Sequence, residues 1–210
     1  QDALFNPLGY HCYYVDAVKK GYSGVAIYSK QKPNKVSRAL GWELSDSEGR
    51  YIHLEYPGLS IASLYLPSGS SGDERQSVKF DYMDKLYEIL AEIRRGQQEF
   101  ILCGDWNIVH KEIDIKNFKG NQKNSGCLPE ERAWIDKVFT ELGLVDAFRV
   151  KNQEAEQYTW WSFRRDSFNK NVGWRIDYQI VTPGLASKIR EVDILKTQQF
   201  SDHAPLIIDY

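Results

Sequence analysis

The chain has 210 residues, which is enough for one domain with a substantial core or for two small ones. Its hydrophobic content of 42% and charged content of 27% are ordinary for a soluble globular protein. No apolar run approaches the roughly 18 residues needed to cross a bilayer, so we expect no membrane-spanning helix and no membrane partner. The net charge of -2 gives no sign of a strongly basic chain, although a local basic patch is enough to contact phosphates.

The three cysteines are Cys12, Cys103 and Cys127. Their odd number, their wide spacing and the lack of a CxxC pair predict a reducing compartment and no zinc site. We therefore expect a cytoplasmic protein, or a nuclear one in a eukaryote, and not a secreted one.

Turn residues separate the predicted elements. In chain order, we expect strands at 24–29, 50–56 and 59–66, a helix at 76–95, a strand at 99–103, a helix at 129–142, and strands at 145–149, 175–181 and 205–209. Both helices have apolar residues at helical spacing and end before a glycine. The short connection "YPGL" predicts a hairpin between 50–56 and 59–66. The pattern indicates a mixed α/β protein with much antiparallel pairing.

Polar side chains stand where strands end in four short segments. These segments are "SLYLPSGS", "GDWNIVH", "GWRIDYQIV" and "SDHAPL". Taken singly, a tyrosine in a strand usually packs, and an aspartate after a strand usually caps a helix or a turn. A carboxylate inside an apolar strand needs a partner, however. The candidate residues from these segments are Tyr65, Asp105, Asn107, Asp177, Asp202 and His203.

Together these residues fit metal-dependent hydrolysis of a phosphodiester. Asp105 can deprotonate or orient water, and Asn107 can fix the carboxylate and the phosphate. Tyr65 can hydrogen-bond a phosphate oxygen or assist the leaving group.

The remaining three candidates complete this hypothesis. His203, held by Asp177, can donate to the phosphate, and Asp202 is a hard oxygen ligand suited to Mg²⁺. The rival reading is a Ser-His-Asp hydrolase, which lacks support because the sequence has no G-x-S-x-G motif.

At this point the sequence resembles a known family. The segments "GDWNIVHKEIDIKNFKGNQKNSGCLPEER", "GWRIDYQIV" and "SDHAPL", in this order and spacing, are similar to the exonuclease III family of AP endonucleases, within the endonuclease/exonuclease/phosphatase superfamily. The resemblance implies a single domain over 1–210 with the DNase I-like fold, a four-layered αββα sandwich of two mixed, largely antiparallel sheets. It also implies Mg²⁺-dependent cleavage at abasic sites, with 3'–5' exonuclease, 3'-phosphatase and 3'-phosphodiesterase as related activities.

The resemblance also assigns roles residue by residue. It implies catalytic roles for Tyr65, Asp105, Asn107, Asp177 and His203, and a metal set of Asp202, Asp105, Asn107 and His203 that binds Mg²⁺ or its substitute Mn²⁺. The resemblance also implies that Asn117, Asn121 and Lys123 contact DNA. They belong to the loop 116–124, which contains three lysines and three asparagines. Trp160, Trp174 and Ile176 form the apolar pocket for a flipped abasic sugar. The expected partner is double-stranded DNA with an abasic site or a 3' end, bound by a monomer.

One departure from the family is expected to matter. Family members begin with a strand carrying an Asn and a second strand ending in a metal-binding Glu, and neither precedes "QDALFNPLGYHCYYV". We expect a native protein with roughly 40 more residues at this end. We also expect an open sheet edge beside 24–29 or 99–103.

Two other functions stay open from the sequence. A catalytically impaired fragment of the same fold would bind DNA without cutting it. A phosphatase of the same superfamily would act on a small phosphoester.

Overall fold

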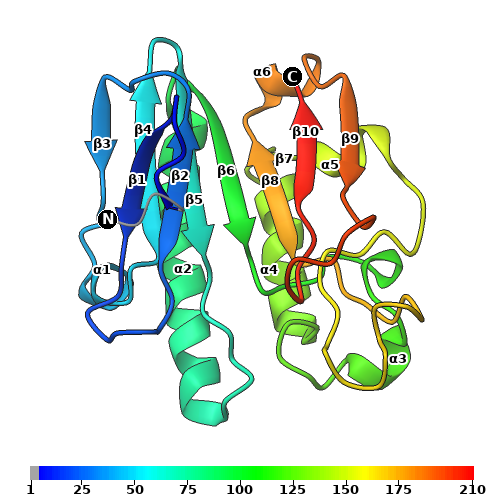
Figure 1. Ribbon diagram of the computed structural model, residues 1–210. Coiled ribbons are helices and arrows are strands. Elements are labelled where there is room, and N and C mark those ends of the chain that lie inside the picture. Colours follow the sequence, from blue (N-terminus) through cyan, green and yellow to red (C-terminus); the bar gives the residue numbers. More distant parts are fainter. Residues whose placement is uncertain (1–4) are drawn as a thin grey trace.

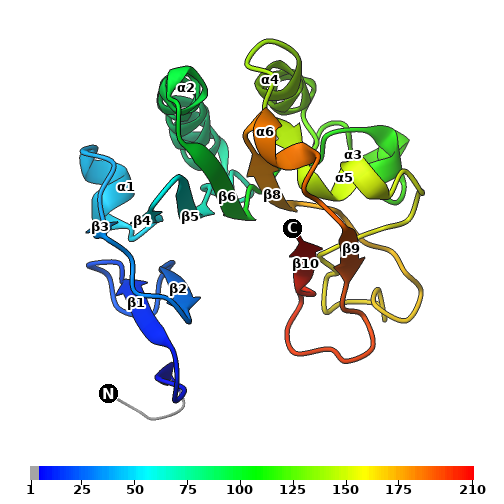
Figure 2. The ribbon, with the colours of Figure 1, turned by 90° about the horizontal axis from the view of Figure 1, so that it is seen from above.

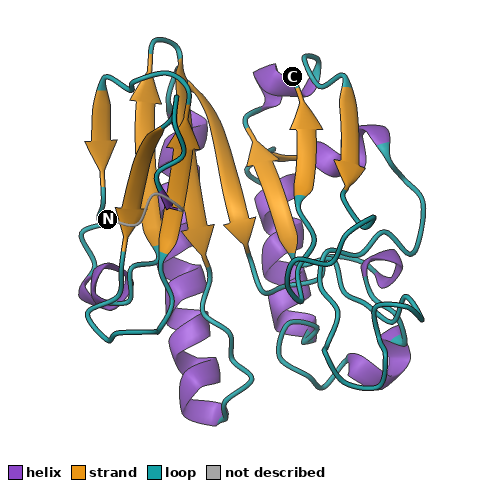
Figure 3. Cartoon of the chain, viewed as in Figure 1, coloured by secondary structure: helices purple, strands orange, loops and turns teal. Residues whose placement is uncertain are grey.

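A mixed six-stranded sheet forms the centre of the computed structural model, which describes residues 5–210 (Figure 1, Figure 3). Its strand order is β3–β4–β5–β6–β8–β7. Neighbouring strands are antiparallel except β5 and β6, which run parallel. The strands are β3 (Lys35–Ser37), β4 (Tyr51–Tyr56), β5 (Leu59–Tyr65), β6 (Glu99–Asp105), β7 (Val145–Asp146) and β8 (Asp177–Val181).

Helices cover one face of this sheet (Figure 2). The two long helices, α2 (Asp73–Arg95) and α4 (Pro129–Thr140), pack against each other and bury the main core, which includes Leu64, Leu102 and Trp106. Shorter helical segments are α1 (Glu43–Ser47), the 3₁₀ turn Glu112–Asp114, α3 (Phe118–Asn121), α5 (Ala147–Lys151) and α6 (Pro183–Ala186).

Two separate strand pairs lie on the other face (Figure 2). One pairs β1 (His11–Val15) with β2 (Val25–Ser29), and the other pairs β9 (Glu191–Ile194) with β10 (Leu206–Asp209). Within residues 5–210, the second edges of β2 and β10 have no ladder partner. The open edge expected beside 24–29 is therefore present, whereas β6 is paired on both sides.

The predicted sandwich needs a correction for the part of the chain that the structure describes. The mixed, largely antiparallel α/β character is confirmed. The second sheet is two separate pairs, however, and no helical layer covers their outer face in residues 5–210 (Figure 2). The described residues therefore form three layers, which are the helices, the six-stranded sheet and the two outer strand pairs.

Most predicted elements are confirmed, with shifts of a few residues at their ends. The hairpin pairs Tyr56 with Leu59, and α2 begins three residues before the predicted helix. The strand at 145–149 is wrong beyond its second residue, because the Asp146 side chain accepts from the Arg149 N–H and starts α5. The short strands β1, β3 and β9 were not predicted.

Candidate active site

Three of the predicted catalytic residues lie in one row across the central sheet. Tyr65 ends β5, Asp105 ends β6 and Asp177 begins β8, and the register pairs Tyr65 with Asp105 and Asp105 with Asp177. Gly104 permits this close approach, because a Cβ there would lie 1.8 Å from the Leu64 carbonyl oxygen. The row places two carboxylates and a phenol at the same edge of three adjacent strands.

Asn107 fixes the Asp105 carboxylate from the turn that follows β6. Its backbone N–H donates to Asp105 Oδ1 at 2.8 Å, and its side-chain Nδ2 donates to Asp105 Oδ2 at 3.0 Å. The same Nδ2 donates to the Leu66 carbonyl at 2.9 Å, just past the end of β5. Both carboxylate oxygens therefore have a donor, and the Asn107 side-chain oxygen is left for another partner.

The His203 imidazole is held by Asp177 and points its second nitrogen away from that carboxylate. Nδ1 lies 2.9 Å from Asp177 Oδ2. Burial lowers the pKa of His203, but the bond and charge of Asp177, with the charges of Asp105 and Asp202, outweigh burial and raise this pKa to about 9. At neutral pH the imidazole is therefore protonated and offers Nε2–H as a donor.

Burial and neighbouring acidic groups raise the pKa values of both Asp105 and Tyr65. Burial, followed by the charge of Asp177, raises the pKa of Asp105 to about 7. Burial and the charge of Asp105 also raise the pKa of Tyr65. Asp105 is thus poised to exchange a proton near neutral pH, while Tyr65 keeps its hydroxyl hydrogen and can donate it.

An aromatic wall borders these groups within a cavity of about 740 Å³. The Trp160 and Trp174 rings meet edge to face, with centroids 5.9 Å apart, and Ile176 is buried beside them. Trp160 Nε1 donates to Asp202 Oδ2 at 3.0 Å. This hydrogen bond connects the aromatic wall to Asp202, the predicted metal ligand. The cavity lining includes Tyr65, Asp105, Asn107, Lys123, Trp160, Trp174, Ile176, Asp202 and His203.

The predicted metal ligands fit a hard cation in chemistry but do not form a complete set. Asp105, Asn107 and Asp202 supply the oxygen donors that Mg²⁺ prefers. Within residues 5–210, however, no group of three His, Cys, Asp or Glu side chains is placed to hold an ion. The ligand role expected for His203 stays a prediction.

The predicted DNA-binding loop residues divide between two places. Lys123 lines the cavity, but Asn117 and Asn121 lie outside its lining. Asn121 Nδ2 donates to the Asn117 carbonyl at 3.0 Å, and Asn117 adopts a left-handed backbone conformation with φ 58° before α3. Asn121 thus shapes the loop itself, and neither asparagine joins the catalytic cluster.

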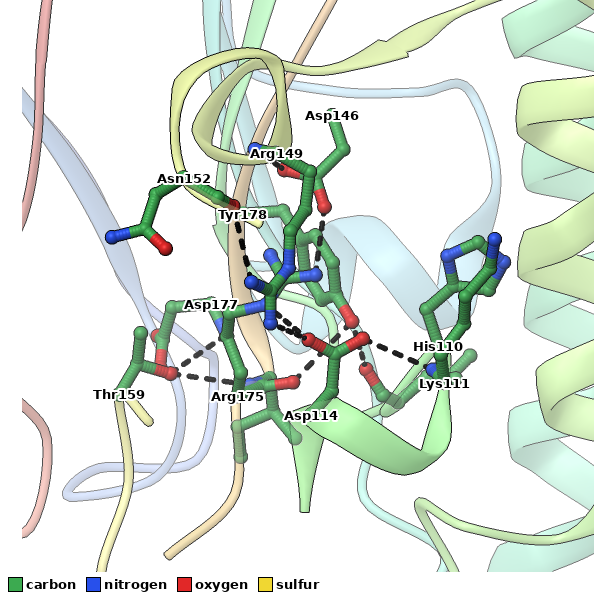
Figure 4. A network of polar contacts seen from close by, with 12 residues as sticks. His110, Lys111, Asp114, Asp146, Arg149, Asn152, Thr159, Arg175, Asp177 and Tyr178 are labelled. Atoms are coloured by element: carbon green, nitrogen blue, oxygen red, sulfur yellow. Dashed lines mark hydrogen bonds and ion pairs between the residues drawn. The ribbon is translucent and has the colours of Figure 1, made fainter. Parts of the chain in front are cut away.

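A buried ion-pair network is centred on Arg175, next in sequence to two residues of the aromatic wall (Figure 4). Arg175, between Trp174 and Ile176, donates to Asp114 at 2.7 Å and to Asp146 at 2.7 Å. Burial raises the pKa of Asp114, but Arg175 and Arg149 outweigh burial and lower it to about 2. We did not predict this network from the sequence, and the arginine within "GWRIDYQIV" was its only signal.

Thr159 is a second supporting residue that the sequence reasoning missed (Figure 4). Its buried hydroxyl accepts from the N–H groups of Ile176 and Asp177, each at 3.1 Å. Its carbonyl accepts from the Ala204 N–H at 2.8 Å. Thr159 therefore bonds to the backbone at Asp177 and beside His203, which fixes the relative positions of the pair. A threonine before two tryptophans gives no sequence signal for this role.

Comparison with known proteins identifies the family of this chain. Residues 1–203 match the model of the endonuclease/exonuclease/phosphatase family. An exodeoxyribonuclease of Bacillus subtilis is 40% identical over 201 residues, covering 95% of this chain and 79% of that protein. The DNA repair nuclease APEX1 of Danio rerio is 37% identical over 195 residues, covering 90% of this chain but only 61% of that protein.

Solved structures give the same relationship. An AP endonuclease from Archaeoglobus fulgidus superposes with a TM-score of 0.87 at 29% identity, covering 99% of this chain and 82% of that one. A 3' phosphatase from Neisseria, bound to a product DNA hairpin, superposes with a TM-score of 0.90 at 26% identity and the same coverage. The expected resemblance is confirmed: the chain belongs to the endonuclease/exonuclease/phosphatase family, among the metal-dependent nucleases of DNA repair.

Proposed function

We propose that this protein hydrolyses DNA phosphodiesters at abasic sites and at 3' ends, with Mg²⁺ as its cofactor. The observation that carries the proposal is the row of Tyr65, Asp105 and Asp177 across three strands, with His203 bonded to Asp177. This row puts a base and a charged donor into one cavity. The reaction includes 3'-phosphatase and 3'-phosphodiesterase activity, because each breaks the same kind of P–O bond.

Asp105 acts on the attacking water. Its carboxylate takes a proton from the water as the oxygen attacks phosphorus, and the two hydrogen bonds from Asn107 keep the carboxylate oriented. Asp105, Asn107 and Asp202 would hold Mg²⁺, or Mn²⁺ as its expected substitute, and the ion would supply positive charge against the phosphate.

His203 and Tyr65 stabilise the charge that develops as the bond breaks. The protonated imidazole donates through Nε2 to a phosphate oxygen, and Asp177, which accepts from Nδ1–H, stabilises the positive charge of the ring. The Tyr65 hydroxyl donates to a phosphate oxygen or to the departing oxygen. Both donors are held in position before the reaction begins, so the site needs little reorganisation to stabilise the transition state.

The aromatic wall selects the substrate. A flipped sugar without a base fits between Trp160, Trp174 and Ile176, whereas a normal nucleotide carries a base that the wall excludes. Lys123 at the rim, with Asn117 and Asn121 farther along the loop, contacts the DNA backbone.

The proposal extends to the state of the protein in the cell. We infer a monomer, formed as one domain, in the cytoplasm or the nucleus, and its three free thiols suit a reducing compartment. No helix in residues 5–210 has the length and apolarity to cross a bilayer. The complete four-layered sandwich is also part of the proposal, supported by the open edges of β2 and β10.

The test is cleavage of a labelled duplex that carries one tetrahydrofuran abasic analogue. The purified chain is assayed with Mg²⁺, with Mn²⁺ and with EDTA, beside an Asp105→Asn variant prepared identically to exclude host nucleases. A nicked duplex ending in a 3' phosphate tests the second activity. Metal-dependent cutting 5' to the analogue that Asp105→Asn lacks supports the proposal, and a chain that neither binds nor cuts the duplex overturns it.

A second candidate function is a DNA-binding protein of this fold without catalysis. The incomplete metal set within residues 5–210 favours it. Its signature is binding of the abasic duplex that EDTA does not change, with no cutting at any Mg²⁺ or Mn²⁺ concentration. A small-molecule phosphatase would instead show equal competition by single nucleotides and by duplex DNA.

A further inference from the structure

Lys79 lies on the buried face of α2, where a charged residue is unexpected. The neighbouring positions Tyr82, Met83 and Leu86 on the same face pack in the core, and Lys79 itself is 0% exposed. Lysine is almost never fully buried unless it is paired. The position of this lysine therefore requires an explanation in terms of its partners.

The first partner is the equally buried carboxylate of Glu131 in the first turn of α4. Lys79 Nζ lies 2.6 Å from Glu131 Oε1. The second oxygen, Oε2, accepts from the backbone N–H groups of Gly126 at 2.6 Å and Leu128 at 3.1 Å. Gly126 and Leu128 line the catalytic cavity, so Glu131 connects the lysine to the cavity wall.

The second partner is the carbonyl oxygen of Asn107, to which Lys79 Nζ donates at 2.8 Å. Asn107 adopts a left-handed conformation with φ 51°, which few residues other than glycine and asparagine adopt. Its N–H and Nδ2 are the two groups that hold Asp105. The carbonyl is the remaining backbone polar group of this residue, and a charged donor gives it a strong hydrogen bond.

A purely structural role does not account for this arrangement. A buried ion pair commonly stabilises a fold no better than apolar residues of the same volume. Here the charge is directed at the turn that carries Asn107.

We propose that Lys79 is a positioning residue for the reaction: bonded to Glu131, it holds the Asn107 carbonyl and so keeps the turn 105–107 in the conformation that orients the Asp105 carboxylate. This inference rests on the proposed nuclease function for its catalytic consequence. Its structural consequence, the fixed turn at Asn107, is independent of whether the chain cuts DNA.

The test compares three variants with the wild type. Lys79→Met removes the charge and keeps the length of the side chain. Lys79→Met/Glu131→Gln also removes the unpaired carboxylate, so this variant folds even where the single one does not. Tyr82→Phe is the matched control, because it removes a buried 3.2 Å hydrogen bond to Ser45 from the same helix face without contacting the turn.

Two readouts are measured, together with the thermal midpoint. The first readout is single-turnover cleavage of the abasic duplex. In both Lys79 variants, we expect the rate to fall about tenfold to a hundredfold, because misplacement of a catalytic group by a fraction of an ångström has an effect of this size. The Kd for DNA should stay unchanged. Tyr82→Phe keeps the wild-type rate even at a lower midpoint.

The second readout is amide hydrogen exchange at Asn107, whose N–H is bonded to Asp105. Protection falls about tenfold or more in the Lys79 variants and not in Tyr82→Phe. Unchanged protection in folded Lys79 variants overturns the inference, as do wild-type cleavage rates in them. An inactive wild type with lost protection in the Lys79 variants refutes the nuclease function and supports the fixed turn.

Discussion

Replacing Asp177 by asparagine tests how the structure controls the proton on His203. The substitution keeps the shape of the side chain beside Nδ1 but removes the negative charge 2.9 Å from the ring. Asp177 supplies the leading interactions that raise the pKa of His203 against the effect of burial. We therefore expect this pKa to fall from about 9 toward the ordinary value of a histidine.

The size of the defect then depends on pH in a way that can be calculated. At pH 8, a pKa of about 9 leaves roughly 90% of His203 protonated, whereas a pKa of about 6.5 leaves roughly 3%. The variant should thus lose about 30-fold in rate at pH 8 and less than about twofold at pH 6. Loss of the Asp177 charge also lowers the pKa of Asp105, which favours the variant further at pH 6.

The assay is single-turnover cleavage of the abasic duplex by wild type and Asp177→Asn between pH 5.5 and 9.5. The wild-type rate should rise as Asp105 loses its proton near pH 7 and fall as His203 loses its proton near pH 9. A defect of the same size at every pH would refute the reasoning. In that case Asp177 would act by orienting the ring and not by holding its proton.

Two further outcomes follow from other parts of the structure. Asp114→Asn breaks a buried ion pair with Arg175 and should lower the free energy of unfolding by about 3–5 kcal/mol in urea titrations. Because the pKa of Asp114 is lowered to about 2, the stability it contributes is present above pH 4 and is lost as the pH falls toward 2, so wild type and variant should converge in acid. Lys123→Ala should reduce the slope of log Kd for DNA against log salt by about one without changing the single-turnover rate, and an unchanged slope would remove Lys123 from the DNA contact.

Local sequence patterns were enough to identify the strand ends that carry the chemistry. Tyr65, Asp105 and Asp177 were each found at or within a predicted strand. Their alignment in one row depends on strand order and register, which long-range packing determines and single segments do not encode. The segment at 145–149 was misassigned for a local reason, since the side chain of Asp146 caps a helix that begins there.

The charged residues inside the protein were the hardest to predict. Lys79, Glu131 and Asp114 have surface-like side chains, and only their partners from distant segments make their burial possible. The protonation of His203 likewise follows from the carboxylates around it and not from its own motif. A lysine on an otherwise apolar helix face and an arginine within "GWRIDYQIV" were the signs of such pairing in the sequence.

Trp160 connects the aromatic wall with the cluster of Asp202 and His203. Its ring packs on Trp174, its indole N–H bonds to Asp202, and its backbone bridges to His203. A nucleotide that displaced this ring would therefore disturb Asp202 and His203 in the same movement. Under the proposed function, discrimination against undamaged DNA should then appear as slow turnover of bound substrate more than as weak binding.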